Sequence, residues 1–177
     1  MPDRSLKLRG RVAAVLGDNV DTDMIFPGRY LNITDREKTA EHLFELAYPE
    51  LRASLQPGDI IVAAKNFGCG SSREQAAAAL KFSGAGAVIA GSFARIFFRN
   101  SINLGLPAVV SADAAGQCAV GDELEIDLTA GEIRNLTQNR TIAAAALDPR
   151  AAELVTAGGL IPYLKRKVGS LAGSAHA

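Results

Sequence analysis

The sequence predicts an α/β fold built on a mixed sheet. Two short apolar runs, 60–64 and 87–90, flank an alanine-rich segment of high helix propensity, an order typical of a parallel strand–helix–strand crossover. Further along, apolar side chains alternate over 124–128 and are expected to pair with those in 133–136 across the turn 129–131, as in an antiparallel hairpin. With 48% hydrophobic residues, the 177-residue chain can build a proper core. We therefore expect a layered fold of mixed β and α structure.

The N-terminal third contains one predicted strand and two short predicted helices. The strand is expected at 11–16, where valine, alanine and leucine lead into the turn signal at 17–19. The segment 24–31 contains a Pro-Gly pair and is expected to form an irregular extended loop. Apolar positions at helical spacing over 39–55, interrupted by a proline, predict two short helices.

The elements of the C-terminal half are predicted from the same kinds of sequence pattern. A helical segment rich in arginine and phenylalanine follows Gly91-Ser92-Phe93, and a short strand is expected at 108–111. A final helix is predicted over 148–156, where Asp-Pro starts it and two glycines end it. We expect a single domain over 1–168, followed by a small, polar and disordered tail over 169–177.

The composition excludes several classes of protein. The charge is balanced at 19 basic and 19 acidic residues, so nothing points to nucleic acid or to an anionic membrane. No run approaches the roughly 20 apolar residues of a membrane-spanning helix, and the N-terminus lacks the apolar stretch of a signal peptide. Two cysteines make no disulfide framework, so we expect a reducing cytoplasm.

The stretch richest in chemistry is Asn66-Phe67-Gly68-Cys69-Gly70-Ser71-Ser72-Arg73-Glu74-Gln75, between a predicted strand and the alanine-rich helix. Its two glycines allow backbone conformations that are closed to other residues and allow a ligand to approach closely. The helix that follows points unpaired N–H groups and the positive end of its dipole into the same space. The stretch therefore predicts a site for an anion.

The two serines of this turn have two interpretations. Ser71 with Glu74, and Ser72 with Gln75, both fit the capping-box spacing, and one serine at most can be the cap. In the first interpretation one serine caps the helix, the other is solvated and Arg73 is a surface charge. In the second, the uncapped hydroxyl and the Arg73 guanidinium converge on a bound carboxylate or phosphate. The spacing leaves both open.

Other familiar motifs do not fit. A phosphate-binding loop needs Gly-Lys-Ser/Thr where this chain has Gly-Ser-Ser-Arg, and a nucleophile elbow needs a glycine two residues after the serine. Of the two histidines, His42 falls in a predicted helix and His176 in the tail, so neither is a convincing base for a serine triad.

Three carboxylates, Asp18, Asp21 and Asp23, lie within six residues and suggest a metal site at first sight. The spacing lacks the glycine and the terminal glutamate of a calcium loop. Asx side chains commonly bond nearby backbone N–H groups, so turn and capping roles are favoured. No metal ligand is therefore assigned.

Three segments in order carry a resemblance: Asp18–Asp23, the turn 66–75, and Gly91-Ser92-Phe93-Ala94-Arg95-Ile96-Phe97-Phe98-Arg99-Asn100. From about Arg9 to about Lys167 the chain resembles the small subunits of 3-isopropylmalate dehydratase, which correspond to the mobile fourth, or swivel, domain of aconitase. The resemblance implies a layered β/β/α swivel domain of the aconitase superfamily.

The resemblance also implies a function. It indicates the small subunit of a heteromeric hydro-lyase that isomerises 2-isopropylmalate and 3-isopropylmalate by dehydration and rehydration in leucine biosynthesis. The implied partner is a large subunit that carries a [4Fe–4S] cluster, because a cluster needs several thiolates and this chain has Cys69 and Cys118 alone. No cofactor is expected on this chain. The alternatives are a related citramalate or 2,3-dimethylmalate dehydratase, a homoaconitase, and a non-catalytic anion-binding regulatory module.

The resemblance assigns the reacting groups to the central turn. Ser71 stands at the family's catalytic serine and is expected to act as the base, while Ser72 and Arg73 are expected to bind a substrate carboxylate. The residues expected to frame this site are Gly68, Gly70, Asp21, Asp23, Ser92 and Arg95.

A second region is expected to choose the substrate. By resemblance, Arg29 corresponds to a substrate-carboxylate arginine, and the loop Tyr30–Thr34 discriminates substrates by their variable group. Homoaconitase small subunits carry an arginine at the position of Asn32, where it pairs with an extra carboxylate. Asn32 and Ile33 bring no charge, so an alkyl substituent is favoured over the additional carboxylate of homocitrate.

Overall fold

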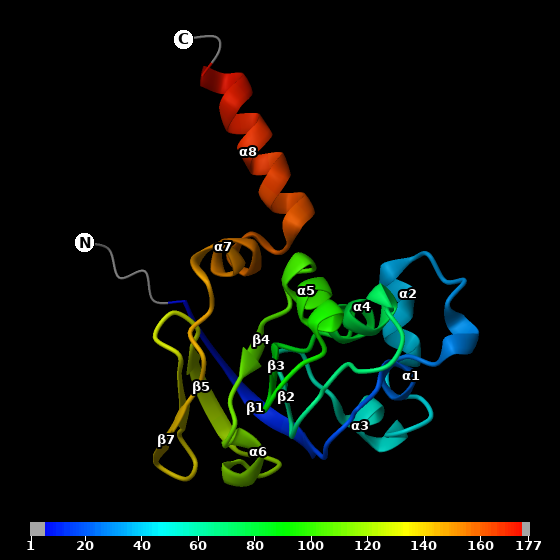
Figure 1. The fold of residues 1–177 in the computed structure, drawn as a ribbon, viewed down its shortest axis with the longest axis vertical. Coiled ribbons are helices and arrows are strands. Elements are labelled where there is room, and N and C mark those ends of the chain that lie inside the picture. The colour runs from blue at the N-terminus through cyan, green and yellow to red at the C-terminus, as the bar shows by residue number, and fades with distance from the viewer. Residues whose placement is uncertain (1–5, 175–177) are drawn as a thin grey trace.

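The computed structural model describes residues 6–174, with side chains through 169, and its main element is one seven-stranded sheet (Figure 1). The strands are β1 (Lys7–Leu16), β2 (Ile60–Ala63), β3 (Ala87–Ala90), β4 (Ala108–Val110), β5 (Glu123–Asp127), β6 (Glu132–Asn135) and β7 (Arg140–Ala143). The α-helices are α1 (Thr22–Ile25), α2 (Arg36–Thr39), α3 (Pro49–Ser54), α4 (Glu74–Phe82), α5 (Arg95–Asn103), α6 (Ala114–Gln117), α7 (Pro149–Ala157) and α8 (Leu160–Ser174). Two 3-10 helices are η1 (Gly28–Tyr30) and η2 (Ala40–His42).

Strand β1 belongs to both halves of the sheet, whose order is β4-β3-β2-β1-β5-β6-β7. From Val12 onward β1 pairs in parallel with β2, and its first five residues, Lys7 to Arg11, pair antiparallel with β5. The register shifts between Val12 and Ala14, where β1 changes partners. We call β1–β4 the parallel half and β5–β7 the antiparallel half. The predicted mixed sheet, with parallel crossovers and an antiparallel hairpin, is confirmed.

Two local features differ from what the sequence predicted. The segment 24–31 is not an irregular loop but contains the end of α1 and all of η1. Helix α1 begins behind Asp21, whose side chain accepts from the N–H of Met24 at 2.8 Å. Strand β7 was missed, because Ile142 is its sole buried residue and no alternation marks it.

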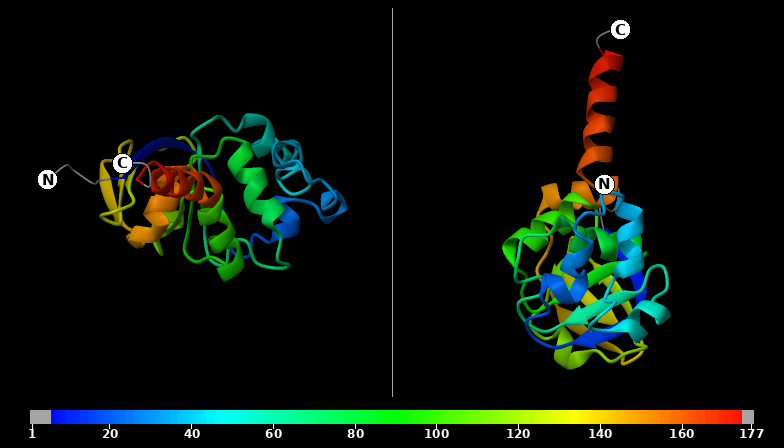
Figure 2. Two further views of the ribbon diagram at one scale, coloured as in Figure 1. Left: turned by 90° about the horizontal axis from the view of Figure 1, so that it is seen from above. Right: turned by 90° about the vertical axis from the view of Figure 1, so that its right-hand side faces the viewer.

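The C-terminal region ends in two helices. Helix α7 is the predicted final helix, and Gly158 closes it with φ 83° in the left-handed region. Helix α8 then runs to Ser174 and projects away from the body (Figures 1 and 2), so residues 169–174 are helical where a disordered tail was expected. Tyr163 anchors α8 in a small core with Ile102 and Leu154. Residues 175–177 lie outside the described part of the chain.

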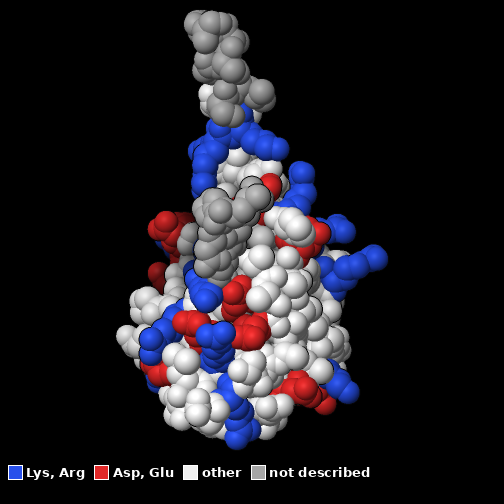
Figure 3. All heavy atoms as spheres, turned by 90° about the vertical axis from the view of Figure 1, so that its left-hand side faces the viewer, with Lys and Arg blue, Asp and Glu red and all other residues white. Residues whose placement is uncertain are grey.

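The face that includes the antiparallel half carries both signs of charge (Figure 3). Ion pairs cross its strands, among them Arg9 of β1 with Glu123 of β5 at 3.3 Å and Arg134 of β6 with Glu125 of β5 at 3.9 Å. Such exposed pairs contribute little to stability, but they leave no broad field of one sign on the body of this face. No helix within residues 6–174 is long and apolar enough to cross a membrane.

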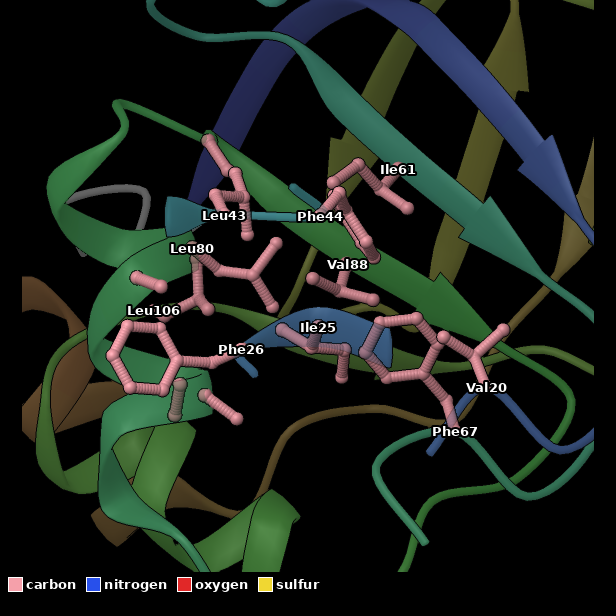
Figure 4. Packing of buried hydrophobic residues seen from close by; sticks show 14 of the residues in the cluster. Val20, Ile25, Phe26, Leu43, Phe44, Ile61, Phe67, Leu80, Val88 and Leu106 are labelled. Atoms are coloured by element: carbon pink, nitrogen blue, oxygen red, sulfur yellow. The ribbon is translucent and has the colours of Figure 1, made fainter. Parts of the chain in front are cut away.

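The parallel half is buried on both faces, because it separates two hydrophobic cores. Along β2, Ile61 and Ala63 face the core shared with the helices, and Ile60 and Val62 face the core shared with the antiparallel half. Figure 4 shows the first of these, where Leu80 of α4 packs among side chains from the sheet and from α1. The layers are therefore β, β and α, as predicted.

Candidate active site

The chain segments that follow β1, β2 and β3 meet at one edge of the sheet. This edge is the carboxyl end of the parallel strands, where ligands of open α/β sheets bind. The N–H of Gly68 donates to the carbonyl of Val20 at 2.7 Å, and the N–H of Phe67 donates to the carbonyl of Ser92 at 3.0 Å. The turn 66–73 is thus held between the other two segments.

The backbone of the turn needs its glycines. Asn66, Gly68 and Gly70 have φ of 62°, 75° and 90°, all in the left-handed region that glycine occupies without cost. A Cβ on Gly68 would lie 2.1 Å from Cγ of Phe97, a distance that real atoms do not reach. The turn therefore folds tightly against the first turns of α5.

Neither serine caps helix α4. The N-cap is Arg73, which makes no side-chain cap bond, so the interpretation in which one serine caps the helix is wrong. Both serine side chains are exposed, and within the described chain neither hydroxyl makes a hydrogen bond. The carbonyl of Ser71 accepts from the Thr22 hydroxyl at 3.0 Å, which fixes its backbone. Both hydroxyls are thus free for a ligand.

The partners that a capping box requires are engaged elsewhere. The Glu74 carboxylate pairs with Arg36 at 2.5 Å, and Nε2 of Gln75 donates to the carbonyl of Leu31 at 3.4 Å. Both contacts tie the start of α4 to the segment that contains η1 and α2. Because these partners are distant in sequence, spacing alone was unable to reveal them.

Arg73 is held firmly beside the serines. Its two terminal nitrogens bind the two oxygens of Asp23, with Nη2 to Oδ2 at 2.9 Å, and Nη1 also donates to the carbonyl of Phe26 at 3.4 Å. The hydrogen bond from Arg73 is the largest effect that lowers the pKa of Asp23. The Nε of Arg73 is buried and has no partner among the described residues. One donor of this guanidinium is therefore still unsatisfied.

A hollow of about 220 Å³ opens in front of these groups. It is lined by Thr22, Gly68, Gly70, Ser71, Ser72, Arg73, Ala94, Arg95, Ile96 and Phe97. Arg95 is exposed and forms no ion pair within residues 6–169, so it presents a free positive charge. The hollow thus combines two hydroxyls, two guanidinium groups and the start of α4, a set of groups suited to a carboxylate.

The remaining framing residues hold the backbone. Oδ1 of Asp18 accepts from the N–H of Lys65 at 2.7 Å, and Oγ of Ser92 accepts from the N–H of Asn66 at 2.9 Å. With the cap formed by Asp21, these contacts confirm the turn and capping roles that were favoured over a metal site. Across the part of the chain that the structure describes, no three His, Cys, Asp or Glu side chains could hold a metal ion.

The segment expected to choose the substrate lies beside the hollow but does not line it. Arg29 turns to Glu45, with Nη2 to Oε1 at 2.5 Å. Asn32 is exposed, and Ile33 lines a second hollow of about 220 Å³ together with Gln75. The structure thus brings Ser71, Ser72, Arg73 and Arg95 together, and leaves the three residues of this segment outside.

Sequence reasoning missed one residue of the site and one residue of the segment beside it. Thr22 lines the hollow and bonds the Ser71 carbonyl, and Glu45 binds Arg29 from a separate segment. The position of Thr22 directly after the cap residue Asp21 is a signal that could have found it. Glu45 carries no such signal, because its partners meet it through tertiary structure alone.

The β/β/α layers and the glycine turn at the sheet edge define an aconitase-type swivel domain. Residues 48–113 match the Aconitase C-terminal domain family. A crystal structure of 3-isopropylmalate dehydratase from Methanocaldococcus jannaschii superposes with a TM-score of 0.85 at 42% identity, covering 97% of this chain and 100% of that one.

Curated relatives narrow this class. The 3-isopropylmalate dehydratase small subunit of Moorella thermoacetica is 53% identical over 86% of this chain and 92% of its own. The isopropylmalate/citramalate isomerase small subunit of M. jannaschii is 48% identical over 91% of this chain and 95% of its own. The methanogen homoaconitase small subunit of Methanothermobacter thermautotrophicus is 50% identical over 89% of this chain and 91% of its own. The chain belongs to the family of 3-isopropylmalate dehydratase small subunits. It is a lyase subunit, and its family's name implies a large-subunit partner.

Proposed function

We propose that this chain, with a large subunit, isomerises 2-isopropylmalate and 3-isopropylmalate by dehydration and rehydration in leucine biosynthesis, in the cytoplasm. The observation that carries the proposal is the hollow in which Arg73 and Arg95 lie with two serine hydroxyls that make no hydrogen bond within the described residues. It is supported by relatives at about 50% identity over nearly the whole chain. We also propose that residues 1–168 act as one swivel domain.

Ser71 is the base in this proposal. Its oxygen removes the proton from the carbon next to a substrate carboxylate as the hydroxyl group departs, which leaves an unsaturated diacid. The same oxygen returns a proton when water adds with the opposite regiochemistry. A serine hydroxyl is a weak acid, so its alkoxide needs nearby positive charge, which Arg73, Arg95 and the start of α4 supply.

Arg73 and Ser72 bind a substrate carboxylate. Asp23 orients the Arg73 guanidinium through two hydrogen bonds, and the unsatisfied Nε leaves capacity for a further acceptor. The Ser72 hydroxyl is free to donate to the same carboxylate. Arg95, which has no ion pair in the described chain, is suited to a second carboxylate of the substrate.

The residues of this chain do not fit an iron–sulfur cluster. Cys69 and Cys118 are its two cysteines, and both are free thiols. Burial, with a further contribution from Asp122, raises the pKa of Cys118 to about 11, which disfavours the thiolate that a ligand must be. We therefore assign a [4Fe–4S] cluster to the large subunit, where it would supply a Lewis acid for the departing hydroxyl.

The substrate is an alkylmalate in this proposal, because Asn32 and Ile33 bring no charge that could pair with a third carboxylate. Isopropylmalate is the first choice. Citramalate is the second, since a relative at 48% identity is named for both substrates.

The test is anaerobic reconstitution with a cysteine-bearing large subunit of the same family and its cluster. Formation of the unsaturated acid is followed by ultraviolet absorbance from 2-isopropylmalate, 3-isopropylmalate, citramalate, 2,3-dimethylmalate and homocitrate, with each subunit alone as control. We expect turnover in the mixture alone, fastest with the isopropylmalates. Binding without turnover of any substrate would instead support a regulatory module, and preference for homocitrate would contradict the substrate assignment.

A further inference from the structure

One carboxylate, that of Glu45, receives three side-chain hydrogen bonds from two segments. Its Oε1 accepts from Nη2 of Arg29 at 2.5 Å and from the Tyr30 hydroxyl at 3.1 Å, and its Oε2 contacts Nδ1 of His42 at 2.7 Å. The hydrogen bond with His42 is the largest effect that lowers the pKa of Glu45, so the carboxylate is ionised at neutral pH. A single side chain therefore joins η1 to the segment 42–45.

Ring contacts hold the same groups in one arrangement. The Tyr30 and His42 rings stack with centroids 3.6 Å apart and planes 15° from parallel, and Phe26, which is fully buried, meets the His42 ring edge-on at 6.3 Å. The Arg29 guanidinium lies over the Tyr30 ring at 4.8 Å. These contacts connect the cluster to the main core and limit the motion of η1.

The opposite side of η1 faces the active site. A Cβ on Gly28 would lie 3.3 Å from both terminal nitrogens of Arg73 and 3.1 Å from Oδ1 of Asp23. The N–H of Gly28 also donates to that oxygen at 3.1 Å. Asp23 orients Arg73, and η1 contacts this ion pair through Gly28. Glu45 holds η1 through Arg29 and Tyr30, so η1 forms a fixed wall beside Arg73.

We propose that Glu45 is a positioning residue for substrate binding: by holding η1 through Arg29, Tyr30 and His42, it fixes the wall that keeps Arg73 in place. The inference rests on the proposed function, because it assumes that Arg73 binds a substrate carboxylate. Arg29 then acts through Glu45 and does not contact the substrate. This reading agrees with the hollow, whose lining includes Arg73 but not Arg29.

The test compares E45Q with wild type in the assembled, cluster-loaded enzyme, with E41Q as the matched control, because Glu41 is an exposed neighbour outside the cluster. Loss of a charge-assisted hydrogen bond that positions a binding group is expected to raise KM for 2-isopropylmalate about tenfold and to change kcat less than about twofold. E41Q is expected to keep both constants. An unchanged KM for E45Q, in a preparation whose wild type is active, would overturn the inference, whereas an inactive wild type would overturn the proposed function instead.

A double-mutant comparison separates the two roles of Arg29. If Arg29 acts through Glu45, R29Q with E45Q together raise KM no more than the stronger single variant. If the two effects multiply, Arg29 binds the substrate itself and the inference is wrong. Should E45Q lower the melting temperature of the isolated chain too far for assembly, Y30F provides the same test, because it removes one hydrogen bond to Glu45 and keeps the stacked ring; a KM raised about threefold is then expected, and no change overturns the inference.

Discussion

The two halves of the sheet differ in the hydrogen bonding of their polar side chains. In the antiparallel half, the buried Asp122 accepts from the N–H of Ala119 at 2.8 Å and from the side-chain amides of Asn135 and Gln138 at 2.7 and 2.6 Å. At the end of the parallel half, the hydroxyls of Ser71 and Ser72 have no hydrogen bond within the described chain. One half satisfies its polar groups internally, and the other leaves them for a ligand.

Strand direction explains the difference. Parallel strands all end at one edge, so the segments after β1, β2 and β3 gather their side chains in one place. In the antiparallel half, successive turns lie at opposite ends of the strands, so fewer turns meet at each end. The turn before β5 and the turn after β6 share one end, and there Asp122 is paired with the N–H of Ala119 and with the side-chain amides of Asn135 and Gln138.

The largest expected effect follows from removing a hydroxyl at the parallel end. We expect S71A to lower kcat of the assembled enzyme by about 10³-fold, because the proton-transferring group is lost. The melting temperature of the isolated chain should stay the same, because the hydroxyl makes no hydrogen bond with the residues that the structure describes. Steady-state kinetics and thermal unfolding check the two statements, and wild-type turnover in S71A would remove Ser71 as the base.

The next effect concerns the backbone that carries the serines. We expect G68A to lower the free energy of unfolding by about 3 kcal/mol, because its methyl group would overlap the Phe97 ring and its φ is 75°. The matched control is G17A, which has no atom within 4 Å of the added methyl group and should change stability by less than about 0.5 kcal/mol. Urea denaturation of both variants measures the difference, and equal stabilities would show that the turn tolerates a side chain.

The smallest effect belongs to the antiparallel half and depends on pH. Burial, the largest influence on Asp122, would raise its pKa, but hydrogen bonds from Ala119, Asn135 and Gln138 hold the pKa below its ordinary value. A lowered pKa contributes stability above the unfolded value, about 3.9, and this contribution is lost as pH falls through the folded value. We expect D122N to cost about 2 kcal/mol at pH 7, less below about pH 4.

The assembled D122N enzyme should keep wild-type kcat, because Asp122 lies in the half that carries no part of the site. Urea denaturation at pH 7 and at pH 3.5 measures the change in stability, and the isomerase assay measures turnover. A large fall in kcat with normal stability would mean that the two halves are not separate in function.

Local patterns predicted the parts of the fold that local patterns control. The strand β2, the helix α4 and the strand β3 follow from apolar runs and an alanine-rich segment, and the glycine turn between β2 and α4 follows from its own residues. Strand β7 was not predicted, because its single buried residue, Ile142, gives no alternating apolar pattern. Helix α8 was not predicted, because the small residues near its end suggested a disordered tail.

In the site, too, local contacts could be predicted from the sequence and distant contacts could not. The residues of the turn 66–73 are adjacent in sequence, so their convergence could be predicted. Glu74 pairs with Arg36, 38 residues away, and is therefore not available for a capping box with Ser71. This ion pair forms only when α2 packs on α4. The same holds for Arg29, whose direction is decided by Glu45, 16 residues away.

The dual pairing of β1 has a consequence for synthesis on the ribosome. Residues Lys7 to Arg11 emerge before their partner strand, which begins at Glu123, so this part of β1 stays an open edge until β5 has been made. An unpaired edge invites association between nascent chains. Lys7, Arg9 and Arg11 place a positive charge at every second position of it, and such charges disfavour edge-to-edge aggregation while the chain waits for β5.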